Sequence, residues 1–300
     1  MTKLICLVGL PASGKSKIAD ELSVKENAII HSSDSLREEL FGDVNECNKN
    51  NELFQELHRR IKQDLKASKN VIYDATNISY KKRKAFLEEL KKINCQKICY
   101  LIATPYELCL KQNLTRERKV PEHVIKKMYL SFYIPQYYEG FNEINIVWNF
   151  NPYDLPWDEL KERLDISQDN PHHTLTIYDH CVKCKDNVIE QTDDMYLKFA
   201  ALYHDIGKVF TKQFKNSKGE YTDIAHYFNH HLVSAYDSLF YLKKGNFTDK
   251  DIFKITNYIQ WHMQPFFLKE EKSVNKFINL VGQEFYDKLL ILHEADKMAK

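Results

Sequence analysis

The chain carries the segment Gly9-Leu-Pro-Ala-Ser-Gly-Lys-Ser16 between an apolar run, Leu4–Val8, and a segment of helical character. It matches the pattern G-x-x-x-x-G-K-[ST] in the strand-then-helix context that the pattern requires. Backbone N–H groups of such a loop surround a polyphosphate, and the following helix directs its positive end toward it. Lys15 would reach the β- and γ-phosphates, and the Ser16 hydroxyl would join Mg²⁺. The segment therefore predicts an ATP site formed by Gly9, Pro11, Ala12, Ser13, Gly14, Lys15 and Ser16.

Short apolar runs and helix-periodic segments alternate through the first 150 residues. Strands that alternate with helices indicate a parallel sheet covered by helices on both faces, so we expect an α/β domain over residues 1–150. The expected strands are Leu4–Val8, Ala28–His31, Val71–Asp74, Ile98–Ile102 and Ile144–Trp148, and the clearest helices are Glu52–Ala67 and Tyr80–Lys92.

The character of the chain changes after residue 150. Residues 149–157 contain two prolines and no hydrophobic period, and we expect a linker over 151–164. Beyond it we find no convincing strand, so we expect an all-α domain over 165–300. Its helices are expected around His180 and over Tyr196–Asp205, His230–Leu242, Asp251–His262 and Phe285–Ala299.

Charge also separates the two halves. Residues 1–150 hold 24 Lys and Arg against 19 Asp and Glu, whereas the remainder holds 19 against 23 together with 9 of the 12 histidines. This asymmetry suggests two chemistries but is too small to indicate a nucleic-acid partner by itself. No apolar run approaches the ~20 residues of a membrane span, and the start is no signal peptide, so we expect a cytoplasmic protein with no membrane partner. The seven scattered cysteines are expected to be reduced thiols.

The second expected strand runs into His31-Ser-Ser-Asp-Ser-Leu-Arg37. Because the carboxyl ends of parallel strands line the ligand crevice, Asp34 would lie where it can take the proton of an acceptor hydroxyl. Arg37, one helical turn later, would face the same side and could bind a substrate phosphate. The alternative is that Asp34 only caps the start of a helix over Ser35–Phe41.

Polar residues also follow the third expected strand and a later helix. Asp74 is a carboxylate placed to hold the Mg²⁺ shell, and Thr76 and Asn77 either line the same crevice as ATP contacts or form a turn at the strand end. Arg116 and Arg118 lie between two expected helices. They form either a lid over ATP, since phosphoryl transfer depends on charge stabilisation, or a solvated charge run.

Two other groups have open interpretations. The basic run Lys81–Lys84 either follows a phosphate backbone or forms a solvated helix face, and we favour the second. Five aromatic residues either stack on bases or pack in the core, and packing is expected for most of them. They are Tyr129, Phe132, Tyr133, Tyr137 and Tyr138.

The segments GLPASGKS, SSDSLR, VIYDATN and RERKVP together resemble the 5′-hydroxyl polynucleotide kinase branch of the P-loop kinases, over about residues 1–150. The resemblance implies that Asp34 is the general base and that Lys15 and Ser16 bind ATP and Mg²⁺. It also implies that Arg37 contacts the 3′ phosphate of a nucleic acid and that the lid arginines clamp ATP. Related P-loop kinases act on small hydroxylated molecules, so the size of the acceptor stays open.

The second half gathers histidine and aspartate. Tyr203-His-Asp-Ile-Gly-Lys208 stands at the end of an apolar helix that Gly207 is expected to stop, which leaves His204 and Asp205 in its last turn. Imidazole and carboxylate ligands together suit Mn, Fe, Ni, Co or Zn. The other members of the pattern are His180, His230, His262 and Asp296.

This order of residues resembles the HD superfamily of metal-dependent phosphohydrolases over about residues 165–300. The resemblance implies a first ligand set of His180, His204, Asp205 and Asp296. It also implies a second metal held by His230 and His262 with Asp205 as the bridge, and a phosphate contact from Lys208. His231 departs from the pattern, since the family often has an acid there, and the departure concerns the hydrogen bond that orients His230.

The remaining candidates have structural interpretations. His172, His173 and His293 are expected to be structural, whereas His226 is undecided between a ligand and a structural role. Cys181-Val-Lys-Cys184 lacks a second cysteine pair and is expected to pack in the core.

A kinase for 5′ hydroxyls joined to a hydrolase for 2′,3′-cyclic or 3′ phosphates would heal both ends of a broken strand. We therefore expect an ATP- and Mg²⁺-dependent polynucleotide kinase with a metal-dependent phosphohydrolase, acting on RNA or DNA strand ends. One alternative is a small-molecule or nucleoside kinase fused to an HD nucleotidase, and another is a non-catalytic, ATP-gated nucleotide sensor. The sequence leaves open the RNA or DNA preference, the metals of the second half and the oligomeric state.

Overall fold

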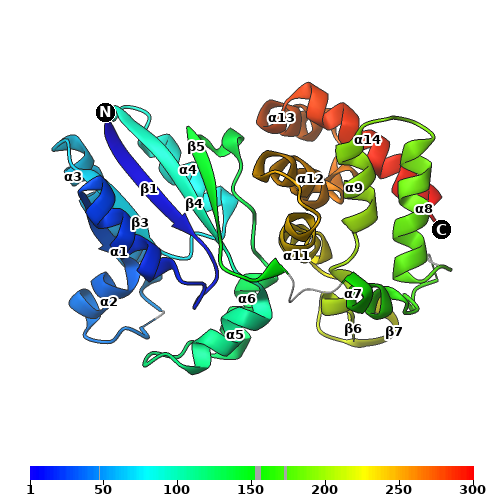
Figure 1. Ribbon diagram of the computed structural model, residues 1–300, viewed down its shortest axis with the longest axis horizontal. Coiled ribbons are helices and arrows are strands. Elements are labelled where there is room, and N and C mark those ends of the chain that lie inside the picture. Colours follow the sequence, from blue (N-terminus) through cyan, green and yellow to red (C-terminus); the bar gives the residue numbers. More distant parts are fainter. Residues whose placement is uncertain (47, 153–156, 172–173) are drawn as a thin grey trace. The chain divides into compact units, whose positions relative to one another are not determined.

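Five parallel strands form the sheet of the first half of the chain, as the alternation of apolar runs and helical segments predicts (Figure 1). Their order across the sheet is β2-β3-β1-β4-β5, and every neighbouring pair is parallel, so all five carboxyl ends meet at one edge. Each expected strand is confirmed, with the bounds β1 Thr2–Val8, β2 Ala28–Ser32, β3 Asn70–Asp74, β4 Cys95–Ala103 and β5 Glu143–Trp148.

The computed structural model describes residues 1–46, 48–152, 157–171 and 174–300. The chain divides into two compact units, of which the first comprises Met1–Met128 and Pro135–Phe150 and the second comprises Tyr129–Ile134 and Asn151–Lys300. Residues 153–156 of the expected linker lie outside the described residues. The later part of that linker, Trp157–Leu164, is helix α7.

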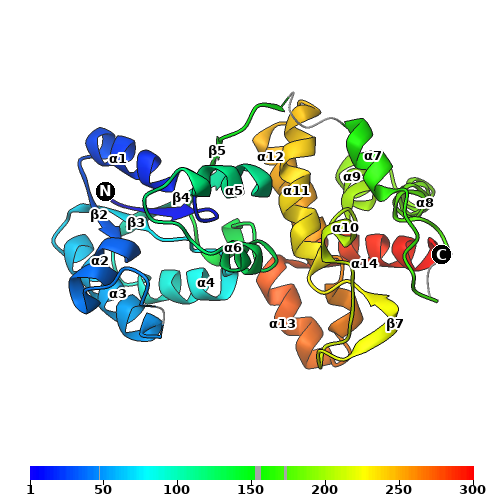
Figure 2. The ribbon, with the colours of Figure 1, turned by 90° about the horizontal axis from the view of Figure 1, so that it is seen from below.

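Helices cover both faces of the sheet because its strands are apolar on both sides. Figure 2 shows α1 (Lys15–Glu26) on one face and α3 (Asn50–Lys66) and α4 (Tyr80–Glu89) on the other. Burying one leucine side chain contributes roughly 1.5–3 kcal/mol, so a stripe of four such residues anchors a helix firmly. The stripe of α3 repeats every four residues and consists of Leu53, Leu57, Ile61 and Leu65. The other helical elements before residue 150 are α2 (Ser33–Phe41), α5 (Tyr106–Leu114), α6 (Glu122–Tyr129) and the short η1 (Tyr137–Glu139).

The basic run Lys81–Lys84 lies in α4. Its member Arg83 fits neither a solvated helix face nor a contact with a phosphate backbone. Its side chain is buried, and its guanidinium donates two hydrogen bonds to the carboxylate of Glu139, at 2.6 and 2.7 Å. The same guanidinium donates to the backbone carbonyl of Asn77 at 2.7 Å. Arg83 is therefore a structural tie between α4, η1 and the segment after β3, and it is neither solvated nor free to contact a phosphate backbone.

Helices build most of the second unit, and the five helices expected after residue 165 are confirmed, whereas α10, η3 and α13 were not predicted. Helix α9 packs against α8 and α12, while α11 packs against α12 and α14 against α8. Tyr129 and Phe132 are buried here against Tyr236, as core packing predicts for them. Within the described ranges, no helix is long and apolar enough to cross a membrane. The bounds are α8 Ile177–Ile189, α9 Met195–Tyr203, α10 Lys208–Thr211, α11 His230–Lys244, α12 Asp249–Trp261, η3 Gln264–Phe267, α13 Glu271–Val281 and α14 Gln283–Met298.

A short hairpin corrects the expectation that this half contains no strand. Strand β6 (Gln213–Lys215) pairs antiparallel with β7 (Tyr221–His226), and the register shifts between Gln213 and Lys215. Most residues of both strands are exposed, so they carry no apolar alternation by which a strand could be predicted. The hairpin connects α10 to α11.

Candidate functional site

The phosphate-binding loop joins β1 to α1, and its two motif glycines are required for different reasons. Gly14, the N-cap of α1, has φ 96°, a left-handed conformation that favours glycine. A side chain at Gly9 would place its Cβ 2.6 Å from Oγ of Ser13, so the tight turn leaves no room for one. The glycine spacing of the motif therefore follows from backbone conformation at one position and from close packing at the other.

Side chains from two other strand ends fix this loop. The carbonyl of Ser13 accepts hydrogen bonds from Oγ1 of Thr104 at 2.9 Å and from Nδ2 of Asn149 at 3.1 Å. Thr104 and Asn149 directly follow β4 and β5, whose carboxyl ends lie at the edge where the loop sits. Sequence reasoning missed both residues, although their position just behind two expected strands is a signal that could have found them.

Lys15 and Asp74 bring opposite charges to this edge of the sheet. Nζ of Lys15 donates to the carbonyl of Leu10 at 2.6 Å. Burial lowers the pKa of Lys15, an effect that the charge of Asp74 opposes, and burial raises the pKa of Asp74, an effect that Lys15 opposes. The charges of Asp34 and Arg116 act on both groups, so four charged side chains form one electrostatic cluster. Ser16, the next residue after Lys15, is exposed in the first turn of α1.

Asp34 is not the N-cap of α2. Ser32 occupies that position, and its Oγ accepts a hydrogen bond from the backbone N–H of Ser35 at 3.5 Å. Asp34 lies in the first helical turn, where its half-exposed carboxylate forms an ion pair with the guanidinium of Arg118. The capping alternative is therefore wrong, and the carboxylate is accessible to an alcohol.

The three arginines predicted at this edge differ in their contacts. Arg37 is buried, and its guanidinium donates to the backbone carbonyl of Glu46. Arg118, between α5 and α6, donates to the carbonyl of Val44 at 2.9 Å in addition to its pairing with Asp34. The charge of Arg116 lowers the pKa of both Lys15 and Asp74. The two lid arginines therefore act on different groups.

Thr76 and Asn77 connect the end of β3 to the neighbouring strand. The carbonyl of Thr76 accepts a hydrogen bond from the backbone N–H of Gly9 at 3.1 Å. Asn77 has a left-handed backbone, with φ 47°, and its Nδ2 donates to the carbonyl of Leu7 at 2.9 Å. These contacts are those of a strand-end turn, and they hold the entrance of the phosphate-binding loop in place.

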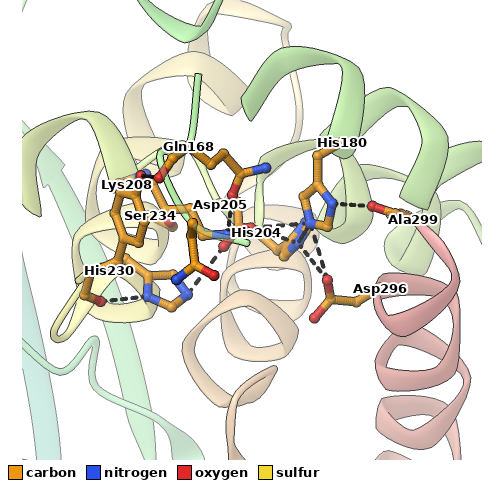
Figure 3. Close-up of polar contacts among 12 residues, drawn as sticks. Gln168, His180, His204, Asp205, Lys208, His230, Ser234, Asp296 and Ala299 are labelled. Atoms are coloured by element: carbon orange, nitrogen blue, oxygen red, sulfur yellow. Dashed lines mark hydrogen bonds and ion pairs between the residues drawn. The ribbon is translucent and has the colours of Figure 1, made fainter. Parts of the chain in front are cut away.

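The second unit brings together all six residues that the sequence pattern assigns to a metal site. Figure 3 labels His180, His204, Asp205, His230 and Asp296 among them. They come from α8, the turn after α9, the start of α11, the end of α12, and α14. Asp205 belongs to two groups. Its Oδ2 lies 3.2 and 3.3 Å from Nε2 of His180 and His204, and its Oδ1 lies 3.1 and 3.7 Å from Nε2 of His230 and His262. Within each group the ligand atoms lie within 4.8 Å of one another, and Oδ1 of Asp296 completes the first, 3.1 Å from Nε2 of His180.

In all four histidines the second ring nitrogen, Nδ1, lies within hydrogen-bond distance of a backbone carbonyl oxygen. Figure 3 shows this contact for His180 and His230. Because a carbonyl only accepts, Nδ1 must carry the hydrogen, and Nε2 of the neutral ring is left with a lone pair. The Nε2 atoms of His180 and His204 lie 3.2 Å apart, as do those of His230 and His262. The Nδ1 partners are Ala299 for His180 (2.5 Å), Ala201 for His204 (2.7 Å), Tyr227 for His230 (2.7 Å) and Ile259 for His262 (2.7 Å).

This donor set fits divalent cations. The Nε2 atoms of the neutral imidazoles and the carboxylate oxygens offer lone pairs that converge, and Oδ1 of Asp205 is buried without a hydrogen-bond partner among the described residues. Burial alone would lower the pKa of His204, yet the carboxylate of Asp205 raises it well above its ordinary value, while burial and the neighbouring histidines lower the pKa of His262. The cluster therefore attracts positive charge, and nitrogen and oxygen donors of this kind suit first-row transition metals.

Lys208 stands beside the cluster and is held by a residue that sequence reasoning missed. Its Nζ lies 2.6 Å from Oδ2 of Asp205 and donates to Oε1 of Gln168 at 2.7 Å. Gln168 is itself buried, and its Nε2 donates to the carbonyl of Leu175 at 3.2 Å. No motif contains Gln168, because it reaches the cluster only through the folding of the segment before α8.

Gly207 has a different role from the predicted one. Helix α9 ends at Tyr203, so His204 and Asp205 lie in the turn after it, and Gly207 is the N-cap of α10. A Cβ at Gly207 would lie 2.5 Å from the carbonyl oxygen of His230 and 2.6 Å from the backbone nitrogen of Ser234. Glycine is therefore required there by the close approach of this turn to α11.

The other histidines and the cysteine pair lie outside the two ligand groups. His226 is 3.1 Å from Oγ1 of Thr222 and belongs to neither group. His231 carries no hydrogen bond that orients His230, since Tyr227 supplies it, and burial lowers the pKa of His231 to about 3. His293 packs edge-on against Phe266, as a structural residue would. Cys181 and Cys184 are buried free thiols, as core packing predicts. His172 and His173 lie outside the described residues.

Comparison with known proteins finds one family match in each half of the chain. Residues 4–135 match the family described as AAA domain, and residues 172–300 match the family described as HD domain. The L-seryl-tRNA(Sec) kinase of Methanococcus maripaludis is 32% identical over 142 residues, which are 44% of this chain and 53% of that protein. The chain thus spans about half the length of this curated relative.

Two solved structures also share similarity with the chain. A chain of the Pnkp1/Rnl/Hen1 RNA repair complex is 24% identical with a TM-score of 0.39, covering 42% of each chain. A gluconokinase from Sinorhizobium meliloti is 12% identical with a TM-score of 0.36, covering 51% of this chain and 85% of that one.

The family matches and the two sites define the class of this protein. The chain joins a domain of the P-loop kinase fold to a helical HD domain. The kinase domain has the parallel five-stranded sheet and phosphate-binding loop, and the HD domain has the histidine and aspartate cluster.

Proposed function

We propose that the kinase domain, residues 1–150, transfers the γ-phosphoryl group of ATP to the 5′ hydroxyl of a polynucleotide. We also propose that the HD domain, residues 165–300, hydrolyses 2′,3′-cyclic or 3′ phosphates at strand ends. The observation that carries the kinase proposal is the phosphate-binding loop at the carboxyl edge of the sheet, with buried Lys15 and Asp74 beside it, together with the half-exposed carboxylate of Asp34. Such a pair of activities would prepare both ends of a broken strand for joining.

The roles of the kinase residues follow from their charges. Loop N–H groups and Lys15 bind the β- and γ-phosphates, and Ser16 and Asp74 are the groups that would hold Mg²⁺, which screens phosphate charge when bound. Asp34 accepts the proton of the 5′ hydroxyl. The hydroxyl oxygen then forms a bond to the γ-phosphorus while the bond to the β–γ bridging oxygen breaks and ADP leaves. The lid arginines stabilise the charge that develops on the transferred group.

In the HD domain, the residues that would hold divalent cations are the two groups that share Asp205. A divalent cation bound there neutralises phosphate charge and makes water acidic enough to lose a proton near neutral pH. The backbone carbonyls accept from Nδ1 of each histidine, which leaves Nε2 as the atom that would bind a cation. Lys208 supplies a positive charge beside the cluster, where it can bind a phosphate oxygen of the substrate.

The kinase proposal is tested with a panel of acceptors and γ-labelled ATP. We expect label on RNA or DNA oligonucleotides with a 5′ hydroxyl, and we expect Asp34→Asn to lower the rate at least about 100-fold because the proton acceptor is lost. Glu38→Gln, an exposed acid on the same helix, serves as the matched control. If oligonucleotides stay unlabelled while nucleosides or sugars are labelled, the polynucleotide proposal is wrong.

A second acceptor is favoured by the curated relative. That protein is named for a kinase activity on L-seryl-tRNA(Sec), so the hydroxyl of a seryl group carried by tRNA belongs in the same panel. The proton transfer to Asp34 would be the same, and only the acceptor-binding groups would differ. Label on seryl-tRNA but not on 5′-hydroxyl oligonucleotides would decide for this second candidate.

The hydrolase proposal is tested with oligonucleotides that end in a 2′,3′-cyclic or a 3′ phosphate. We expect release of inorganic phosphate or opening of the cyclic ester, and we expect Asp296→Asn to abolish both because it removes a ligand of the first group. Asp287→Asn, an exposed acid on the same helix α14, is the control. Cleavage of mononucleotides with strand ends left intact would indicate a nucleotidase instead.

A further inference from the structure

We infer that the segment Asp43–Glu46, between α2 and α3, occupies the acceptor-phosphate subsite of the kinase domain and is displaced by an acceptor that carries a phosphate. The inference rests on the proposed kinase function and concerns how that site selects its acceptor. A neutral alcohol has no group that could replace the segment, so the segment would exclude it.

Backbone carbonyls of this segment accept hydrogen bonds from both arginines on the acceptor side. The guanidinium of Arg37 donates to the carbonyl of Glu46. The guanidinium of Arg118 donates to the carbonyl of Val44 at 2.9 Å and approaches Oδ1 of Asn45 at 3.4 Å. The carbonyl oxygens therefore take the positions on both guanidiniums where the oxygens of a phosphate would bind.

Arg37 is the residue that makes a phosphate the better partner. It is 7% exposed, and its Nε is buried without a hydrogen-bond partner in the described part of the chain. A buried donor without an acceptor is unfavourable, and one carbonyl oxygen satisfies only one edge of the guanidinium. A phosphate offers several charged oxygens, so it can accept from Nε and from a terminal nitrogen together.

Local, exposed hydrogen bonds hold the turn in which the segment presents its carbonyls to the two arginines. Residues 43–46 belong to no helix or strand. The backbone N–H of Asn45 bonds to Oδ1 of Asp43 at 2.8 Å, and that of Asn48 bonds to Oε1 of Glu46 at 2.7 Å, and both contacts are exposed. Exposed hydrogen bonds of this kind contribute little net stability, because water competes for the same groups.

Arg118 connects the segment to the reacting groups. The same guanidinium holds the carbonyl of Val44 and the carboxylate of Asp34. When a phosphate displaces the segment, its charged oxygens replace the carbonyl of Val44 on Arg118 and compete with the carboxylate of Asp34 for the same guanidinium, so the pairing with Asp34 is loosened when the acceptor arrives. The segment thus couples recognition of the acceptor phosphate to release of the proposed base.

Hydrogen exchange tests the displacement without any phosphoryl transfer. We expect adenosine 3′-monophosphate to raise the exchange rate of the Val44–Glu46 amides several-fold, and adenosine, its phosphate-free counterpart, to leave it unchanged. Arg37→Gln should abolish the response. Unchanged or slower exchange at saturating adenosine 3′-monophosphate overturns the inference, whether or not the kinase proposal holds.

Kinetics of a loosened segment give a second test. Asp43→Ala with Glu46→Ala removes the two exposed hydrogen bonds and leaves both arginines intact. We expect KM for a 3′-phosphorylated acceptor to fall about threefold to tenfold with kcat unchanged, because a larger fraction of the enzyme is open to the acceptor. Glu52→Ala, in the first turn of α3, is the control. An unchanged KM, or a fall in kcat alone, contradicts the inference, whereas an enzyme that labels no polynucleotide contradicts the proposed function instead.

Discussion

Gly207 is a single residue whose replacement should disturb the metal site without touching a ligand. In Gly207→Ala the new Cβ would meet the carbonyl oxygen of His230 at 2.5 Å, so the start of α11 must move. We expect a loss of stability on the order of 1–3 kcal/mol, as for other overpacked sites. We also expect metal affinity to fall by about tenfold or more, since His230 moves with the helix. Metal content after dialysis and thermal unfolding measure the two effects.

The control for this substitution lies at the other end of the same helix. Gly245 follows α11, and a Cβ there would meet side-chain atoms of Phe247 at 3.3 Å and the carbonyl of Leu242 at 3.4 Å. Gly245→Ala should therefore leave the metal content unchanged. If both variants lose metal equally, the effect comes from general destabilisation and not from the contact between Gly207 and His230.

Helix α4 and η1 are joined to the end of β3 by the buried pair of Arg83 and Glu139. We expect Arg83→Met alone to destabilise the kinase domain by about 3–5 kcal/mol, because it leaves the carboxylate of Glu139 buried and unpaired. The double variant with Glu139→Met should recover much of this loss, since neither charge remains. Urea unfolding of the single and double variants measures the difference, and additive losses would contradict the paired role.

The packing of α3 against α4 and β3 should depend on pH through His58. Its ring stacks on Phe86 with 3.9 Å between centroids, and its Nε2 lies 3.1 Å from the hydroxyl of Tyr73. Burial lowers the pKa of His58 from 6.5 to about 4. Between these values the unfolded chain binds a proton that the folded chain does not, so stability is complete above pH 6.5 and falls as the pH drops toward 4.

The size of this effect should be on the order of 1–3 kcal/mol, reduced by partial solvent access to the ring. His58→Phe removes the titrating group and keeps an aromatic ring in the stack. Wild type should lose more stability than His58→Phe between pH 7 and pH 5 in urea unfolding. Parallel loss in both proteins would show that His58 is not responsible.

For the molecule as a whole, the two proposed activities should respond independently to metal removal. 1,10-Phenanthroline binds transition metals and not Mg²⁺, so we expect it to lower hydrolysis about 100-fold or more and to leave phosphoryl transfer within about twofold. It should also lower the unfolding temperature of the HD domain, because a ligand of the folded state is lost. The non-chelating isomer 1,7-phenanthroline is the control. If 1,10-phenanthroline inhibits both reactions while the control inhibits neither, the two sites are not independent.

The sequence predicted those parts of the molecule that depend on patterns among residues close together in the chain. The five strands, the main helices and the phosphate-binding loop follow from periodicity and from glycine spacing, and the structure confirms them. The sequence also predicted which histidine and aspartate residues come together in the second unit, because imidazole and carboxylate side chains in this order form a recognisable pattern.

What the sequence did not predict depends on contacts between distant segments. Gln168 reaches Lys208 and Thr104 reaches the carbonyl of Ser13 only after folding, and neither residue type is distinctive. Arg83 resembled a surface charge because its partner, Glu139, lies 56 residues away. The hairpin of β6 and β7 was missed because exposed short strands leave no apolar pattern.

The backbone contacts of the histidines have a consequence for protein engineering. His204, His230 and His262 each bond through Nδ1 to the carbonyl of the residue three positions earlier, at a helix end or a helix start. Each of them thus brings its own orienting acceptor, and no outer carboxylate has to be designed to fix the ring. Such helix-terminal histidines are portable units, which can be grafted onto the helix ends of an unrelated bundle to build a new metal centre.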